Sequence, residues 1–456
     1  MQYTPKCDSP SQASPRFCAA GHGDKPLSIP ASTARSNRWL AMLSKLTAAL
    51  VAGWFTLSAH GQPSEVRAAD RLPELLRLAT TEHPNVKARR NDLRAAGFDV
   101  DAARWSRYPS LATELQTSSG RSQAIVKLEQ PLWTGGRITG QINLASAKFE
   151  AATAGLGEAQ TQALMDTALA FFELSRLDSR LGIALLNEEE HQKLLATIER
   201  RVKAEVSPLT DQTQAGTRLR QAINERIQIQ RQRDNVRFQL EQNIGRPVKG
   251  IHPPRRVRLD AWTPQHLIDV ALNASAQRRR LQAQVEAAQA EIQVTRSQLR
   301  PQVVVGYSSN LGQMSNNERR GQVYLALQLQ TANGLANLSA TEAAVARKAA
   351  LEDAQEIHQR ELAQQIQTLW GDAQTLASQV GPVKALLTGS NEVVESYLRQ
   401  FQVGRKNWLD VLNAQREKTQ AQYALADIES PLLLTHAQLL ILTGTLTPQN
   451  LDTLDE

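Results

Sequence analysis

Residues 322–330, QVYLALQLQ, decide the fold class of this chain, because their side chains alternate strictly between two kinds. Every second residue is a large apolar one, namely Val323, Leu325, Leu327 and Leu329. A period of two predicts a β-strand with one apolar and one polar face. A two-faced strand of about ten residues is long enough to cross a membrane. The alternative is a small soluble sheet packed against helices.

Three further segments have the same alternation, less regularly. We therefore expect four strands, at about 107–119, 122–132, 301–311 and 320–331. A closed membrane barrel needs at least about eight strands, so one chain cannot form it alone. Three copies with four strands each would supply about twelve.

The remaining segments favour long helices. Proline is excluded from helix interiors, and long proline-free stretches are rich in Ala, Leu, Gln, Glu and Arg. We expect helices at about 140–203, 208–245, 334–402 and 407–443. At about 1.5 Å per residue, the two longest would extend ~95–100 Å, too long for a compact globule. A heptad pattern of apolar residues between 362 and 401 also calls for a partner helix.

The two halves of the chain repeat one another. Four landmarks recur in order, 192 to 199 residues apart: Pro109 and Pro301, Gly136 and Gly334, Asp211 and Asp410, Gly245 and Gly444. This duplication predicts a first repeat at 62–245, a linker at 246–264, a second repeat at 265–446 and a tail at 447–456. Each repeat is expected to run helix, strand, strand, long helix, helix.

The first 61 residues form a leader. Residues 42–61, MLSKLTAALVAGWFTLSAHG, place a lysine before an apolar run that ends in small residues, the pattern of a secretory signal peptide. Met42 is the expected true start, residues 1–41 look disordered, and a single membrane anchor is the alternative. No segment besides 40–59 approaches the ~20 apolar residues of a membrane helix, which excludes a polytopic helical membrane protein.

Charge and cysteine usage exclude several function classes. Removing the leader's six basic and two acidic residues leaves 46 and 43, which lowers the net charge from +7 to +3. No arginine-rich face interleaved with aromatics indicates nucleic acid. Cys7 and Cys18 both lie in the leader, so the mature chain has no disulfide, cysteine zinc site or thiol nucleophile. Without HExxH, a nucleophile elbow or a phosphate-binding loop, we expect no enzyme activity, metal or cofactor.

Three motifs resemble the TolC family of outer-membrane channel proteins. They are His83-Pro84 at the start of the first repeat, LEQPLWTGGR at 128–137 and FQVGRKNWLDVLNAQRE at 401–417. The resemblance covers about residues 70–446. It implies a mainly α chain with membrane β-strands, assembled as a homotrimer. Twelve strands, four per chain, would form an outer-membrane β-barrel, continued by a long periplasmic α-helical barrel in a Gram-negative bacterium.

The chemistry of the second motif is readable. Pro131 cannot donate to a strand ladder, so it should end the pairing. Gly135 and Gly136 permit a sharp turn from strand to helix, and Gly334 is their counterpart in the second repeat. Trp133 suits a membrane interface, although a buried core position suits it equally.

The resemblance also implies where function concentrates. Two helix-to-helix turns, 201–211 and 401–413, would form the periplasmic end of the tunnel. Aperture residues would be Asp410 and Asn413, and a latch between the hairpins would use Thr210, Asp211, Lys406 and Phe401. Lys406 would be the basic partner, and Phe401 replaces a tyrosine, which removes a hydroxyl link. For Asp410 the alternative is a solvated acid that stabilises a helix start.

The tips of the hairpins would dock an adaptor protein. The expected docking residues are Glu205, Val206, Ser207, Gly404 and Arg405. Glu205 replaces the tip glycine of the first repeat, whereas Gly404 keeps that of the second. The linker would join a belt around the middle of the tunnel.

The expected function is that of a passive exit duct in a tripartite export system. Type I secretion of an adhesin or toxin, with a periplasmic adaptor and an inner-membrane ABC transporter, is favoured by two features. The string WLDVLNAQRE at 408–417 resembles secretion members of the family, and no lipidation cysteine follows the apolar run. The alternative is efflux of small molecules or metal ions with a proton-driven pump. A periplasmic adaptor or a coiled-coil scaffold fits less well, because neither needs paired alternating strands.

Overall fold

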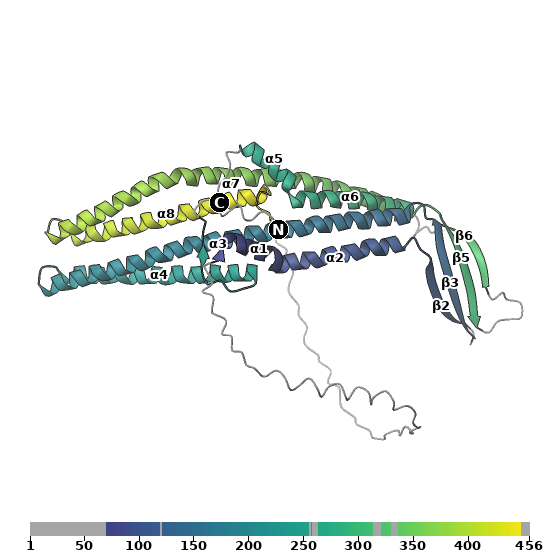
Figure 1. Cartoon of the computed structure of the whole chain (residues 1–456), viewed down its shortest axis with the longest axis horizontal. Coiled ribbons are helices and arrows are strands. Elements are labelled where there is room, and N and C mark those ends of the chain that lie inside the picture. The colour runs from purple at the N-terminus through teal and green to yellow at the C-terminus, as the bar shows by residue number, and fades with distance from the viewer. Residues whose placement is uncertain are drawn as a thin grey trace, which may run out of the picture. The chain divides into compact units, whose positions relative to one another are not determined.

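Two long helical hairpins and one four-stranded sheet make up most of the part that the computed structural model describes, residues 70–118, 121–254, 257, 263–312, 321–329 and 336–447. The first hairpin joins α3 (Arg137–Lys203) to α4 (Leu209–Ile244), and the second joins α7 (Ala336–Gln402) to α8 (Trp408–Leu442). Both hairpins turn at the end opposite the sheet (Figure 1). The expected leader and signal peptide, Gly334 and the tail from 448 on lie outside the described residues.

Each repeat begins with two helices, where one was expected. These are α1 (Leu72–Glu82) and α2 (Pro84–Trp105) in the first repeat, and α5 (Pro264–Ala274) and α6 (Ala276–Ser297) in the second. The breaks occur because one extended residue caps the following helix through its side chain. His83 Nδ1 accepts a hydrogen bond from the Asn85 amide at 3.2 Å, and Ser275 Oγ accepts one from the Arg278 amide at 3.1 Å.

The sheet combines strands from both repeats. Its strands β2 (Ser110–Ser118), β3 (Arg121–Trp133), β5 (Gln302–Gly312) and β6 (Gly321–Gln328) lie in that order, and each neighbouring pair is antiparallel. The central pair, β3 and β5, joins the two repeats. Among the described residues, the outer strands β2 and β6 each have one edge without a partner strand.

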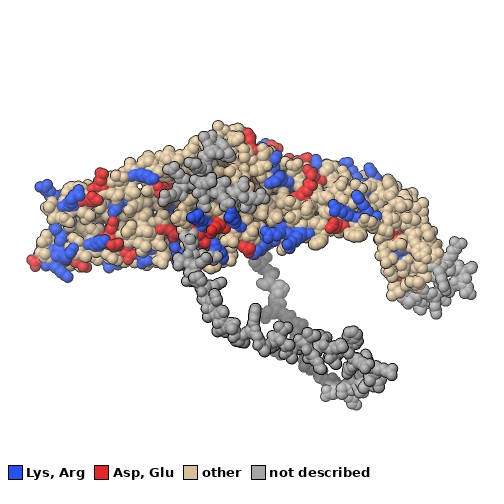
Figure 2. All heavy atoms as spheres, viewed as in Figure 1, with Lys and Arg blue, Asp and Glu red and all other residues tan. Residues whose placement is uncertain are grey.

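The register places apolar side chains on one face of the sheet. One row across all four strands consists of Leu111, Leu128, Tyr307 and Val323, which are 45–75% exposed. Leu325 and Leu327 share that face and are 70% and 73% exposed. In Figure 2 the visible face of the described strands is largely free of charge, whereas the helices carry both signs. An exposed apolar face suits lipid and not a small soluble sheet packed against helices.

The opposite face of the sheet is polar and internally bonded. Lys127 Nζ lies 3.4 Å from Glu114 Oε2 on the neighbouring strand. The Tyr324 hydroxyl donates to Glu129 across Gly306, the residue that separates them in their row. A Cβ atom at Gly306 would lie 2.4 Å from Tyr324 Cζ, so this reach requires glycine. This face therefore suits a water-filled lumen.

The turn after β3 differs in one respect from the sequence-based expectation. Pro131 does not end the pairing, because β3 continues to Trp133. Pro131 pairs with Val304 and Trp133 pairs with Val303, with a register shift between the two pairs. Pairing with β2 does stop, at Glu129, two residues before the proline. The missing N–H is therefore accommodated by a bulge on one side and by the absence of a partner on the other.

Gly135 and Gly136 both adopt the left-handed conformation, with φ of 59° and 95°. At Gly135 a Cβ atom would also lie 2.7 Å from Arg300 Cβ, and the Arg300 guanidinium donates to the Gly135 carbonyl at 3.2 Å. Trp133 is half exposed and not buried in a core. The glycines therefore form the sharp entry to α3, and Arg300 ties this turn to the second repeat.

The main core lies midway along the helices, where α1, α3, α4 and α8 meet. Phe171 and Phe172 are its largest fully buried side chains. The linker returns here, because β4 (Ile251–His252) pairs in parallel with β1 (Asp70–Arg71), near the start of the first repeat. Arg246 Nη2 lies 2.8 Å from Asp70 Oδ1 and fixes this junction.

Helix α8 alone among the described helices is long and apolar enough to cross a membrane by length and composition. Its apolar window has a mean hydropathy of 1.2, a feature that the sequence analysis missed. In the structure α8 packs along α7 and α3, and its buried residues include Val411, Leu439 and Ile441. Its apolarity thus serves packing between helices.

Candidate functional site

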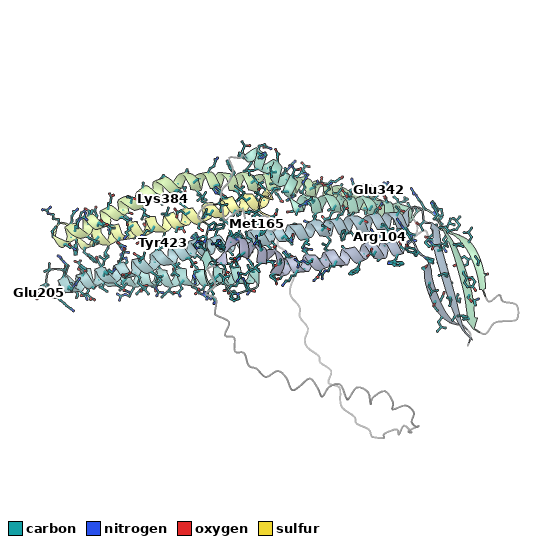
Figure 3. The ribbon with its side chains drawn as sticks, in the orientation of Figure 1. Arg104, Met165, Glu205, Glu342, Lys384 and Tyr423 are labelled. Carbon is teal, nitrogen blue, oxygen red and sulfur yellow. The ribbon has the colours of Figure 1, made fainter. Side chains whose placement is uncertain are left out.

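The two hairpin tips have the same backbone geometry. At the end of α3 the Val206 amide donates to the Arg201 carbonyl at 2.9 Å, and at the end of α7 the Arg405 amide donates to the Gln400 carbonyl at 2.9 Å. This pattern needs a left-handed residue just before the donor. Gly404 takes that place with φ of 75°, and Glu205 takes it with φ of 58°. Figure 3 shows Glu205 at the tip of the first hairpin.

Glu205 is the sole non-glycine residue with positive φ among the described residues. Left-handed backbone costs a non-glycine residue about 1–2 kcal/mol. The first tip therefore stores strain that the second tip avoids. The replacement of the first-repeat tip glycine by Glu205 is therefore visible in the structure, since Glu205 and Gly404 fill the same position of the same turn.

The hairpins pack together just above their tips. The shared core contains residues from all four helices: Ile198, Ala215, Phe401, Trp408, Val411 and Leu412. The rings of Phe401 and Trp408 lie 5.3 Å apart, and both residues are buried. The tips of one chain are thus held against each other by an apolar cluster.

Phe401 also receives a contact that the sequence analysis did not anticipate. The Arg201 guanidinium, from the first hairpin, lies 4.7 Å from the centre of the Phe401 ring. Arg201 Nε also donates to Ser207 Oγ at 3.2 Å, which orients it. The expected latch residue Phe401 therefore lies at the contact between hairpins, but it binds a cation through its ring face. The cluster of basic residues in the last turn of α3 was the available signal.

Lys406 pairs within its own hairpin. Its Nζ lies 3.6 Å from Asp410 Oδ2 and 4.3 Å from the centre of the Tyr397 ring. Among the described residues of one chain, Lys406 makes no hydrogen bond or ion pair with Thr210 or Asp211, so the expected latch pairing is not formed within the chain. The reason is local, since the four-residue spacing to Asp410 brings the closer acid.

The remaining expected residues lie at the tips as follows. Asp410 and Asp211 occupy the first turns of α8 and α4, so the dipole at each helix start favours their charge. The Asp410 side chain is 41% exposed, and Asn413 is half-buried one turn further on. Exposed positions at the end of the hairpins are Glu205, Val206, Thr210, Gly404 and Arg405, whereas Ser207 is half-buried.

Exposed apolar side chains accompany them. Val206, Leu209, Val403 and Leu409 are each at least half exposed, and two come from each hairpin. Basic residues Arg200, Arg201 and Lys203 fill the last turn of α3 beside them. An apolar end bordered by charge suits contact with a protein partner.

A line of charged contacts joins α3 to α8 between the tips and the main core. Asp427 accepts from Arg176 Nη1 at 2.6 Å and from Arg180 Nη1 at 2.7 Å. Further along, Glu190 accepts from Lys418 Nζ at 2.8 Å and from Gln415. Hydrogen bonding to Glu173, and secondarily to Asp427, raises the pKa of Arg176, which stays charged.

These contacts connect the first hairpin to the second. Their residues are about 225 to 250 positions apart in sequence, and no local pattern marked them. Asn187 and Thr419 add a buried hydrogen bond of 2.9 Å on the same line. Hairpin separation would have to break all of them.

Comparison with known proteins assigns the chain. The model of the family "Outer membrane efflux protein" matches residues 75–246 and 267–445, that is, most of both repeats. A comparison with curated proteins finds no match.

Several solved structures share the fold. A membrane protein from Pseudomonas aeruginosa is similar with a TM-score of 0.72 and 20% identity, covering 82% of this chain and 93% of that one. The outer membrane protein VceC from Vibrio cholerae is similar with a TM-score of 0.71 and 17% identity, covering 82% and 96%. The open state of the MtrE outer membrane channel from Neisseria gonorrhoeae gives 0.68 and 17%, covering 82% and 89%.

These matches confirm the expected fold class, in which three chains complete one channel from a β domain and a helical barrel. The two-faced sheet corresponds to the β domain of that architecture, and the paired hairpins correspond to its helical barrel. The chain belongs to the outer membrane efflux protein family, whose members are passive channels of the Gram-negative outer membrane that extend into the periplasm and work in tripartite systems with an adaptor and an inner-membrane pump.

Proposed function

We propose that this chain forms the exit duct of a type I secretion system, with an inner-membrane ABC transporter behind its periplasmic adaptor. The observation that carries the duct itself is the pairing of a two-faced sheet with two hairpins that end in exposed tips. The secretion assignment rests on the string WLDVLNAQRE at 408–417, which resembles secretion members of the TolC family. The exported cargo would be an adhesin or a toxin.

A second candidate is efflux of small molecules or metal ions with a proton-driven pump. The description of the matching family model, which names efflux, favours it. Both candidates use the same duct and differ in the transporter and the cargo.

Deletion of the gene in its native host separates the two candidates. Secretion predicts that one or a few large proteins disappear from the culture medium and return when the chain is supplied again. Efflux predicts unchanged medium proteins together with increased sensitivity to toxic compounds or metal salts. Sensitivity without a secretion defect would overturn the first candidate.

We further propose that the exposed tip residues dock the adaptor. Val206 and Leu209 from the first hairpin and Val403 and Leu409 from the second form its apolar part. Leu209→Asp should weaken cross-linking to the adaptor and export, because a charge would replace an exposed apolar contact. Gln212→Asp, on the next turn of α4, is the matched control. Normal export by the Leu209 variant would contradict docking at this surface.

Asp410 is our proposed aperture residue. If three copies converge on the axis, their ring should attract cations and make the pore cation-selective. Lys406 lies beside Asp410 and should partly neutralise this ring. Asp410→Ala should therefore shift the reversal potential toward anions, and Lys406→Gln should shift it toward cations. If Asp410→Ala leaves selectivity unchanged, Asp410 is a helix-start acid outside the lumen.

A further inference from the structure

A cavity of about 220 Å³ lies between the two hairpins, above the tip core, where α3, α4 and α8 come together. Its polar lining includes Asn187 and His191 from α3, Arg218 and Gln221 from α4, and Arg416 and Tyr423 from α8. Tyr423 is labelled in Figure 3, where its side chain lies between the hairpins. None of the aperture, latch or docking residues named above lines this cavity.

One buried side chain in the lining has a polar atom without a partner. His191 is 6% exposed, yet its Nδ1 makes no hydrogen bond among the described residues. Buried polar groups are almost always paired, so this nitrogen is available to a guest in the cavity. Tyr423 is 8% exposed; burial raises its pKa, and the charge and hydrogen bonding of the neighbouring Glu225 add to that.

The other lining groups are mainly hydrogen-bond donors. Asn187 Oδ1 accepts from Thr419 at 2.9 Å, and Gln221 Oε1 accepts from Arg218 at 2.9 Å, which leaves the NH₂ groups of both amides free to donate. The guanidinium of Arg416 makes no hydrogen bond or ion pair among the described residues, and Arg218 makes no ion pair there. Donors and positive charge together favour an anion.

Charge balance supports the same conclusion. Glu225 is the one carboxylate of the lining, against the two guanidiniums of Arg218 and Arg416. These arginines come from different hairpins, with Arg218 half-buried and Arg416 exposed to solvent. An anion held by both would bridge the two hairpins.

We propose that this cavity binds one small free oxyanion per chain, of the sulfate or phosphate class, and that the anion bridges the first hairpin to the second. The pocket, of about 220 Å³, is open to solvent beside the exposed Gln221, Arg416 and Gln420, and its volume is enough for a tetrahedral oxyanion with bound water. Because the anion binds the packed hairpins, it stabilises their association by mass action.

The site should respond to pH. His191 interacts electrostatically with Glu190 on its own helix and with Arg218 on α4, and it shares the cavity with Glu225 on α4 and with Arg416 and Tyr423 on α8. Burial lowers the pKa of His191, with Glu190 opposing this and Arg218 adding to it. A bound anion would offset both burial and Arg218, so protonated His191 and the anion should favour each other. Binding should therefore tighten on acidification.

Sulfate is a suitable probe because it does not titrate in this range. The midpoint temperature of thermal unfolding of the purified full chain in detergent should rise with sodium sulfate and saturate at low millimolar concentration. Sodium chloride at equal ionic strength should not produce this rise. Arg416→Gln and Arg218→Gln should each weaken sulfate binding, raising the half-saturation concentration about ten-fold. Arg231→Gln, an exposed arginine on α4 outside the cavity, is the matched control and should respond like the wild type.

Calorimetric titration of the unaltered protein gives a second readout that needs no variant. We expect one sulfate per chain, bound more tightly at pH 6 than at pH 7.5. Absence of binding heat, or equal sulfate responses of the wild type and Arg416→Gln, would overturn the proposal and leave only general exclusion of the salt. Neither measurement depends on channel activity, so its outcome is independent of the proposed function.

Discussion

Asp427 is the residue whose replacement tests most directly how the two hairpins are held together. Its carboxylate accepts from both Arg176 and Arg180 of the other hairpin, at 2.6 and 2.7 Å. Asp427→Asn keeps the size and one acceptor oxygen but removes the charge. We expect the closed packing of the hairpins to weaken and the channel to open more often.

The magnitude follows from burial and geometry. A hydrogen bond to a charged group contributes about 1.5–3 kcal/mol when it is well buried. The arginine side chains are each 23% exposed, but that of Asp427 is 37% exposed, so solvent screening reduces each contact to about 1 kcal/mol. The loss is then about 1–2 kcal/mol per chain, or ~3–6 kcal/mol for three chains acting independently. Such a change raises the ratio of open to closed channels about 150- to 20,000-fold, provided that opening separates the hairpins.

Single-channel recording in planar bilayers measures this ratio. The matched control is Glu429→Gln, two residues further along α8. Glu429 lies 2.9 Å from Lys384, but this pair joins helices of the same hairpin, and both side chains are about half exposed. Equal open probabilities for the two variants would refute the inter-hairpin role of Asp427, and so would an Asp427→Asn channel that stays closed.

Three further predictions concern the tips, the sheet and pH. Gly404→Ala should lower the thermal stability of the trimer by about 1 kcal/mol per chain, since alanine is strained at φ of 75°. Glu205→Gly should leave that stability unchanged or raise it. If both substitutions shift the stability in the same direction, the two tips are not equivalent. Leu325→Arg should cost about 2–4 kcal/mol of stability in the membrane if the site lies near the bilayer midplane, whereas Gln322→Arg on the polar face should cost much less. The yield of membrane trimer measures both, and equal yields would point to a soluble sheet. Burial lowers the pKa of His191, so below about pH 6.5 the unfolded chain takes up a proton that the folded chain resists. Stability should therefore fall on acidification in sulfate-free buffer, and an unchanged pH profile in His191→Gln would contradict this.

Much of this architecture could be predicted from residues that are neighbours in the chain. Alternation along 322–330 predicts which side chains share a face, and the register confirms it with Leu325 and Leu327 exposed on the apolar side. Gly135 and Gly136 indicate the turn into α3, since few other residues adopt positive φ. Periodicity and backbone preference are local properties, and a sequence states local properties directly.

The break at Ser275 and the continuation of β3 past Pro131 were not predicted. In each case a local signal was outweighed by a compensating interaction, a side-chain cap at Ser275 and a bulge beside Pro131. Such compensation depends on what the neighbouring element offers. A helix or strand pattern alone does not contain it.

The contacts between the hairpins were decided by tertiary structure alone. Arg201 over Phe401, Asp427 between Arg176 and Arg180, and the donor-rich cavity around His191 each join α3 or α4 to α7 or α8. Whether two side chains meet there depends on how far each helix is rotated about its axis and how the helices are staggered. Both are set by the packing of the whole interface, because a helix of 67 residues presents charged side chains in every direction and only packing selects which of them face a partner.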